Sequence, residues 1–279
     1  MAEITAAAVK QLRELTDLPM MACKQALIEA EGDQDKAVQI LRESVGKVLL
    51  KRADNATTEG RIFIGISEDG LKGSMIELQC ESAPVAGAES FVKFGEACLA
   101  QLMNGPGAST PEELLEQPAP GFNGQTLKQV WEEMVNKIRE KIVVASVTIL
   151  EGGPVGGYVH HDGKTGVLFL AEGDAAKVDV LRDVAMHIAS MRPTVTNVDE
   201  LDPASVAQER KRLSDEAKAS GKPDNIVEKI VDGRMNAHYV EQGVLVVQPF
   251  VKEESKTVSQ ALAEKGLKAK QFVRKVLGV

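Results

Sequence analysis

The sequence predicts an α+β fold in which a small N-terminal bundle of three helices precedes a larger core. Apolar residues follow helical spacing over residues 1–46, with signals that start and stop helices. From Arg61 the apolar residues alternate, which is typical of strands. A β-hairpin followed by a helix then occurs twice, from Arg61 and from Tyr158, and this predicts a duplicated hairpin-plus-helix core. The length of 279 residues suits about two domains.

Composition favours a protein partner inside the cell. The net charge of −8 argues against nucleic acid as a direct partner. The three cysteines are far apart and form no C-x-x-C pair, which fits reduced thiols of a cytosolic protein. Residues 1–3 begin no basic leader, and no apolar run approaches the length of a membrane span. We therefore predict a cytoplasmic chain without a membrane partner.

The N-terminal bundle is predicted over residues 1–46. Thr5, Asp17 and Asp33 can cap the three helices, Pro19 can start the second, and Gly32 can end it. The inner sides are expected to carry Ile4, Ala8, Leu12 and Leu15, then Cys23, Leu27 and Ala30, then Ala37, Ile40 and Leu41. Three short helices with tight turns resemble a ubiquitin-associated domain. Such a module is more suited to binding a partner than to catalysis.

Two adjacent methionines follow Pro19 in the second helix. Successive helical residues point about 100° apart, so Met20 and Met21 cannot both face a small core. At least one is expected on the surface, where a flexible thioether suits a partner. The alternative is that one fills the core and the other is a tolerated surface residue.

Residues 47–60 are predicted to be a linker with a helical start, and residues 61–150 the first half of the core. Ile62, Ile64 and Ile66 alternate before a turn at Asp69-Gly70, and a returning strand follows. Further along are a helix around Phe91, an irregular stretch over 104–124, a helix capped by Thr126, and a strand over 142–150.

The second half is predicted over residues 151–200 and 236–268. It has a turn at Asp162-Gly163 between two strands, and then a helix that ends before Pro193. Residues 244–250 are expected to return to the sheet, followed by a helix over 258–263. The short C-terminal segment 269–279 contains a last strand, over 269–276.

A helical hairpin is predicted over residues 201–235, between the two parts of the second half. Its helices are joined at Gly221-Lys222-Pro223, and its apolar stripe is thin. We expect the hairpin to protrude. The alternative is that it packs on the core.

The motifs that would indicate an enzyme are incomplete. Gly163-Lys164-Thr165 lies one residue too far from Gly157 for a phosphate-binding loop, and it is flanked by strands where that loop needs a helix. His160 and His161 are expected to face opposite sides of a strand, so they cannot chelate one metal. Cys80 is expected to be a buried, inert thiol. We predict no bond-making catalysis, no metal and no cofactor.

The stretch from Thr16 to Leu27 resembles the N-terminal signature of elongation factor Ts, the guanine-nucleotide exchange factor of elongation factor Tu. Seven residues match that signature, namely Thr16, Met20, Met21, Cys23, Lys24, Ala26 and Leu27, whereas Asp17, Pro19 and Ala22 depart from it. Similar agreement continues at Ala185-Met186-His187, Gly221-Lys222-Pro223, Gln248-Pro249-Phe250-Val251 and Ser255-Lys256-Thr257-Val258. The resemblance therefore covers essentially the whole chain.

The resemblance implies an exchange factor that binds GDP-bound elongation factor Tu and promotes GDP release. The implied contacts are Leu12, Met20 and Met21 in the bundle, the loop Ser82-Ala83-Pro84-Val85, and the helix of His187. His187 alone would more often be a packed helix histidine, and that alternative remains. A rival function is a protein that holds or sequesters elongation factor Tu without accelerating release.

One loop departs from the family. Where members have Cys-x-Thr-Asp-Phe-Val-Ala, this chain has Cys80-Glu81-Ser82-Ala83-Pro84-Val85-Ala86. In the family the phenyl ring of this loop intrudes beside the nucleotide site of the partner, and here Ala83-Pro84 replaces the Asp-Phe pair. Longer family members also continue past Val279 into a helix that adds a contact.

Overall fold

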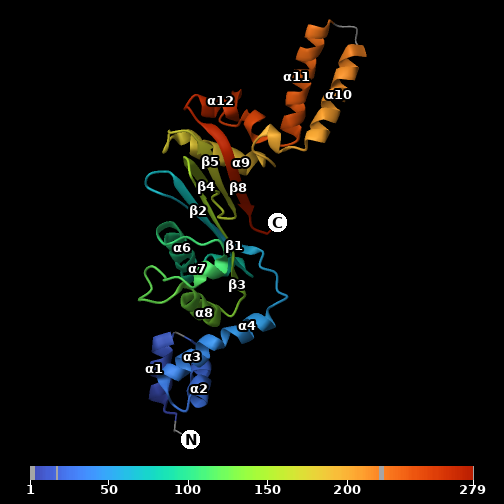
Figure 1. Cartoon of the computed structure of the whole chain (residues 1–279). Helices are drawn as coiled ribbons and strands as arrows, with labels where there is room; N and C mark the ends of the chain where they lie inside the picture. Colours follow the sequence, from blue (N-terminus) through green and yellow to red (C-terminus); the bar gives the residue numbers. More distant parts are fainter. Residues whose placement is uncertain (1–3, 17, 220–222, 279) are drawn as a thin grey trace.

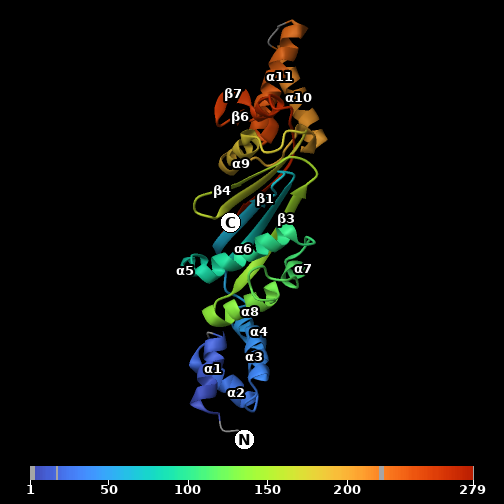
Figure 2. The same ribbon diagram turned by 90° about the vertical axis from the view of Figure 1, so that its left-hand side faces the viewer.

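The computed structural model describes residues 4–16, 18–219 and 223–278 and has a mixed α and β architecture. Helices α1 to α3, within residues 6–43, lie at one end of the molecule, and the hairpin of α10 and α11, within residues 203–241, lies at the other, with the sheets between them (Figures 1 and 2). No helix in the described part of the chain is both long and apolar enough to span a membrane.

The N-terminal bundle consists of α1 (Ala6–Thr16), α2 (Met20–Glu29) and α3 (Gln34–Glu43). The predicted caps at Thr5 and Asp33 are confirmed, since their side chains accept hydrogen bonds from the backbone N–H groups of Ala8 and Lys36. Pro19 was expected to start α2 but is its N-cap, so the helix begins one residue later, at Met20. The predicted cap Asp17 lies outside the described residues. The buried residues of this bundle form one cluster: Val9, Leu12, Leu18, Cys23, Ala26, Leu27, Ala30, Ala37 and Leu41.

Leu15 is not in that cluster, although the sequence places it on the inner side of α1. Its exposed fraction is 69%. The inner side is set by Val9 and Leu12, and Leu15 lies about 120° around the helix from Val9 at 100° per residue. The expectation of a buried Leu15 is therefore wrong, and the bundle presents a large apolar side chain to solvent.

The predicted linker begins with a helix that belongs to the core. Helix α4 (Val45–Lys51) buries Val45 and Val48 in the cluster of the first sheet. The bundle is also joined to α8 (Leu127–Ile138) by polar contacts. Arg42 Nη2 lies 3.1 Å from Glu133 Oε1, and the hydroxyl of Ser44 donates to Asn136 Oδ1 over 2.8 Å. The irregular part of the linker is thus limited to residues 52–58.

The first sheet has the strand order β1-β2-β3 and is antiparallel, with β1 (Glu59–Ile66), β2 (Lys72–Cys80) and β3 (Ile142–Glu151). Helix α6 (Glu89–Asn104) and α8 cover it, and α8 starts with a capping box of Thr126 and Gln129. The short helix α5 (Ala83–Ala86) follows β2. The stretch over 104–124, predicted to be irregular, contains α7 (Pro111–Leu115), which Thr110 caps.

The second sheet has the order β4-β5-β8, with β4 (Val155–Val159), β5 (Thr165–Glu172) and β8 (Lys268–Val276). Helices α9 (Asp179–Met191) and α12 (Val258–Ala263) contribute to its core. Residues 244–250 do not return to this sheet, so that prediction is wrong. They form a 3-10 turn (Leu245–Val247) and a two-stranded ribbon of β6 (Pro249–Phe250) with β7 (Glu253–Thr257), because Pro249 lacks the N–H that a central strand needs.

The two sheets share a cluster of apolar side chains. Its buried members come from both, namely Ile62, Met75, Leu150, Val155, Leu168, Leu170 and Leu277. Glycines allow the close approach: a Cβ on Gly166 would lie 2.4 Å from Ile62 Cγ2, and one on Gly157 would lie 2.8 Å from Ile64 Cγ2. The two halves of the core are therefore tightly packed on one another.

The helical hairpin of α10 (Pro203–Ala219) and α11 (Asp224–Glu241) has a small core of its own. That cluster contains Leu213, Ala217, Val227, Val231 and Met235. Away from its base the hairpin extends beyond the other elements (Figure 1). The predicted turn at Gly221-Lys222 lies outside the described residues.

Replacing residues 203–234 with a short Gly-Ser linker should leave the rest of the chain folded, because the hairpin buries its apolar residues against itself. We expect the shortened protein to unfold in one cooperative transition with a Tm within a few degrees of the full chain, as measured by circular dichroism and calorimetry. A broad, non-cooperative transition would show that the hairpin is an integral part of the core.

Candidate functional site

The first turn of α2 presents both methionines to solvent. The exposed fraction is 51% for Met20 and 74% for Met21, and neither belongs to the cluster of the bundle. Met20 follows the Pro19 N-cap directly, so both side chains lie at the N-terminal end of the helix. Leu12, in contrast, is fully buried and unavailable to a partner in this conformation. Leu12 belongs to the buried cluster of the bundle, together with Cys23, Ala26 and Leu27 of α2.

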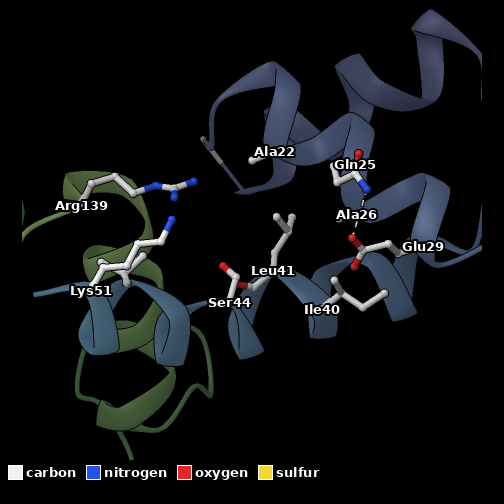
Figure 3. A pocket seen from close by; sticks show the side chains of 10 residues that line it. Ala22, Gln25, Ala26, Glu29, Ile40, Leu41, Ser44, Lys51 and Arg139 are labelled. Carbon is white, nitrogen blue, oxygen red and sulfur yellow. Dashed lines mark hydrogen bonds between the residues drawn. The ribbon is translucent and has the colours of Figure 1, made fainter.

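A groove separates the bundle from the end of the core. Its volume is about 230 Å³, and α2 and α3 form one side while α4 and the end of α8 form the other. Figure 3 shows the side chains of Lys51 and Arg139 extending toward the bundle, with Gln25 and Glu29 across the groove, hydrogen-bonded to each other at 3.1 Å. The groove has two cationic side chains on the core side and one carboxylate on the bundle side.

The substituted loop forms the end of β2 and the single turn of α5. Ala83 and Pro84 are exposed, whereas Ser82 and Val85 are half-buried. Val85 packs against the core of the first half, and the hydroxyl of Ser82 donates to Glu140 Oε1 over 2.7 Å. The loop therefore has anchored ends and an exposed centre at the two positions that depart from the family pattern.

Glu81 fixes this loop to two other segments. Its Oε2 accepts from Arg52 Nη1 and from Asn55 Nδ2, each over 2.7 Å, and its Oε1 accepts from the backbone N–H of Lys141 over 2.6 Å. Burial acts to raise the pKa of Glu81, but these hydrogen bonds and the charge of Arg52 outweigh it and hold the pKa below its usual range. The carboxylate is charged at neutral pH.

Neither Cys80 nor Lys164 has the environment of a catalytic group. Burial raises the pKa of the Cys80 thiol to about 11, so it is not a thiolate at neutral pH. Lys164 Nζ is paired with Glu59 Oε2 at 2.8 Å. No group of three His, Cys, Asp or Glu side chains is placed to hold a metal among residues 4–16, 18–219 and 223–278.

The two histidines near β4 differ from the prediction. His160 and His161 follow β4, which ends at Val159, and their ring centroids are 4.2 Å apart. The strand alternation that would separate them does not apply in the turn, so the expectation of opposite faces is wrong.

His187 lies inside the second half, with an exposed fraction of 1%. Val251 donates its backbone N–H to Nδ1 over 3.3 Å, so the ring proton is on Nε2, which is 2.9 Å from Gln248 Oε1. The packed-histidine alternative therefore describes this side chain, and a direct contact through His187 does not fit its burial. The exposed apolar residues of the same helix are Met186 and Met191, which the sequence analysis did not single out.

The buried ring makes stability depend on pH. Burial lowers the pKa of His187 below its ordinary value of 6.5, although the hydrogen bond to Gln248 acts in the opposite direction. The unfolded chain therefore binds a proton more readily than the folded protein as the pH falls through 6.5. The free energy of unfolding is expected to decrease below that pH, more steeply in the natural protein than in His187→Gln. Urea unfolding between pH 7.5 and 5 measures this, with His160→Gln as the control, and equal slopes in all three proteins would contradict it.

Comparison with known proteins covers both the core and the bundle. A family model described as "Elongation factor TS" matches residues 84–279. The chain is 38% identical to elongation factor Ts of Cytophaga hutchinsonii over 278 residues, which is 98% of this chain and 99% of that protein. It is 40% identical to elongation factor Ts of Bordetella avium over 279 residues, which is all of this chain and 92% of that protein. The chain belongs to the elongation factor Ts family.

The matches to the elongation factor Ts family include the residues of the surfaces described above. The family model begins inside the substituted loop, at Pro84, while the relatives in Cytophaga hutchinsonii and Bordetella avium also cover the bundle that carries Met20 and Met21. A translation elongation factor of this family has a surface for a protein partner as its functional site, and the exposed methionines and the exposed loop are the candidates for that surface.

Proposed function

We propose that this chain binds GDP-bound elongation factor Tu and promotes the release of GDP, so that GTP can replace it. The observation that carries this proposal is the identity of 38% with an elongation factor Ts over 98% of the chain. The protein acts in the cytoplasm, where translation takes place. It makes and breaks no covalent bond, so it is an exchange factor and not an enzyme that transforms a substrate.

Exchange by such a factor follows from linkage. If this chain lowers the affinity of elongation factor Tu for GDP, then at equilibrium GDP lowers the affinity of elongation factor Tu for this chain by the same ratio. Contact with GDP is not required. It is sufficient that the loop after β2 and the bundle bind the partner better when its nucleotide site is distorted.

The proposed architecture has six parts. A bundle of the ubiquitin-associated type over 1–46 docks on the partner, and the linker over 47–60 joins it to a duplicated core. The halves of that core are 61–150, and 151–200 with 236–268. The C-terminal segment over 269–279 completes the second half, because it contains almost all of β8. The order of hairpin, helix and third strand in β1-β2-α6-β3 and in β4-β5-α9-β8 supports duplication. The hairpin over 201–235 is an insertion in the second half.

The proposed contacts are the exposed groups of three surfaces. In the bundle they are Met20 and Met21, and in the first half they are the exposed Ala83 and Pro84, with the half-buried Ser82 and Val85 on either side. In the second half the surface of α9 contributes through Met186, with an exposed fraction of 41%, while His187 supports the helix from within. Leu12 has the same supporting role in the bundle.

The release of labelled GDP from elongation factor Tu tests the function directly. Elongation factor Tu carrying fluorescent GDP is mixed with excess unlabelled GDP in a stopped-flow instrument, with and without the chain. We expect a release rate that rises with the concentration of the chain and then saturates. A complex detected by calorimetry together with an unchanged release rate would support the sequestering function and contradict exchange.

A further inference from the structure

The carboxylate of Glu81 accepts hydrogen bonds from three residues on two segments that are far apart in the sequence. Arg52 and Asn55 belong to the stretch that follows α4, and Lys141 immediately precedes β3. A second bridge connects the same segments, because Lys141 Nζ donates to the carbonyl oxygens of Ala53 over 2.7 Å and of Asn55 over 3.2 Å. Glu81 itself adjoins Ser82, where the exposed loop begins.

We propose that Glu81 is a positioning residue that sets the exchange rate. It does so by holding the loop after β2 against residues 52–55, which follow α4 and so connect to the bundle. This inference rests on the proposed function. Glu81 acts without touching the partner, through Ala83 and Pro84, which begin α5 two residues after Glu81.

The geometry makes Glu81 effective in this role. The Glu81 side chain is 15% exposed and its bond to Arg52 is 2.7 Å long, so the pair is screened less than a surface pair. Hydrogen bonds to a charged acceptor are shorter and stronger than neutral ones. Three donors on one carboxylate fix its position, and a shift of residues 52–55 would move the loop with it.

The same contacts connect the loop to the bundle. Arg52 is the C-cap of α4, and α4 is buried on the first half through Val45 and Val48. The bundle precedes α4 directly and is held on α8 by Arg42 and Ser44. The two proposed docking surfaces, Met20 with Met21 and Ala83 with Pro84, are therefore tied together through α4 and Glu81.

The substitution Glu81→Gln tests the proposal, because it keeps the size of the side chain but removes the charge and one acceptor. The measurement is GDP release from elongation factor Tu at increasing concentrations of the full chain. We expect the saturating release rate to fall about tenfold, the effect of about 1.4 kcal/mol on a barrier. The concentration for half-maximal effect should change less than threefold, since the contact surfaces remain. Glu81→Asp, which keeps the charge, should recover part of the rate.

A double-mutant cycle separates positioning from general destabilisation. The changes Arg52→Gln and Glu81→Gln should be non-additive in the saturating rate, because each removes the same contact. The control pair is Lys128 and Glu116, an exposed ion pair at 2.7 Å in the same half, where single and double changes should leave the rate unchanged. Should Glu81→Gln fail to fold, Arg52→Gln alone decides the question, since it leaves the carboxylate and its two other donors in place.

The outcomes distinguish this inference from the function on which it rests. A natural chain that fails to accelerate GDP release would overturn the proposed function itself. A natural chain that accelerates release, together with saturating rates in Glu81→Gln and Arg52→Gln that equal the natural one, would overturn the positioning role alone. Strictly additive effects in the Arg52 and Glu81 cycle would do the same.

Discussion

GDP release from elongation factor Tu should become about ten- to a hundredfold faster when Ala83→Asp and Pro84→Phe are introduced together. Burial of a phenylalanine side chain contributes about 1.5–3 kcal/mol, and tenfold in rate corresponds to about 1.4 kcal/mol. Pro84 is exposed in α5, so a phenyl group there can reach a partner without rearrangement of the core. The affinity of the complex should change much less than the rate, which stopped-flow and calorimetry measure separately.

The natural loop has no wedge of this kind. The ring of Pro84 is small and its backbone is fixed, and Ala83 cannot accept hydrogen bonds through its side chain. We expect residual exchange in the natural chain through other contacts, such as Lys51 or the loop backbone at Ser82. The assay needs the cognate elongation factor Tu and a second one from a species whose factor has the Asp-Phe pair. Unchanged or slower release on both partners would show that exchange is not driven at this loop.

Removal of both exposed methionines should weaken the complex by about a hundredfold. Each interface anchor contributes about 1–2 kcal/mol when truncated to alanine, and the two effects add if the side chains act independently. Neither Met20 nor Met21 is in the core of the bundle, so the thermal stability of Met20→Ala/Met21→Ala should stay close to that of the natural protein. Calorimetric titration with GDP-bound elongation factor Tu gives the affinity.

Two variants of α2 serve as controls for the methionines. Ile28→Ala removes another exposed apolar residue, at the opposite end of the helix, and should leave the affinity unchanged. Leu27→Ala removes a fully buried residue and should destabilise the bundle by about 2–5 kcal/mol. If the methionine variant unfolds like Leu27→Ala, or binds as tightly as the natural protein when folded, Met20 and Met21 are not interface anchors.

Local signals predicted most of the secondary structure because they act within a few residues. The caps at Thr5, Asp33 and Thr126 and the turn at Asp69-Gly70 each determine a helix start or a hairpin through neighbouring backbone groups. The helix expected near Val258 to Ala263 is α12, and it begins with a capping box of Thr257 and Gln260 that the sequence analysis did not use.

Tertiary context explains the differences. Helix α4 is stabilised by burial of Val45 and Val48 against residues of the first half that are distant in sequence. Residues 244–247 have the apolar pattern of a strand, but Leu245–Val247 form a 3-10 turn next to the buried Gln248. For the candidate site, sequence reasoning identified Met20, Met21 and the exposed loop. Helical spacing also placed Leu12 on the inner side of its helix, where it is buried, so the contact that the family resemblance implied for Leu12 does not fit. For His187 the sequence left both a packed and a contacting side chain open, because one histidine does not show which side of its helix is covered.

The cluster shared by the two sheets also determines how the protein loses its structure. The cluster buries Ile62 and Met75 of the first sheet together with Leu168 and Leu170 of the second. Neither half can therefore unfold without exposing apolar side chains of the other half to solvent. The bundle and the helical hairpin have clusters of their own and can open locally at a lower free energy. Amide hydrogens of β2 and β5 should therefore exchange with solvent only through global unfolding, and those of α2 and α11 through smaller, independent openings.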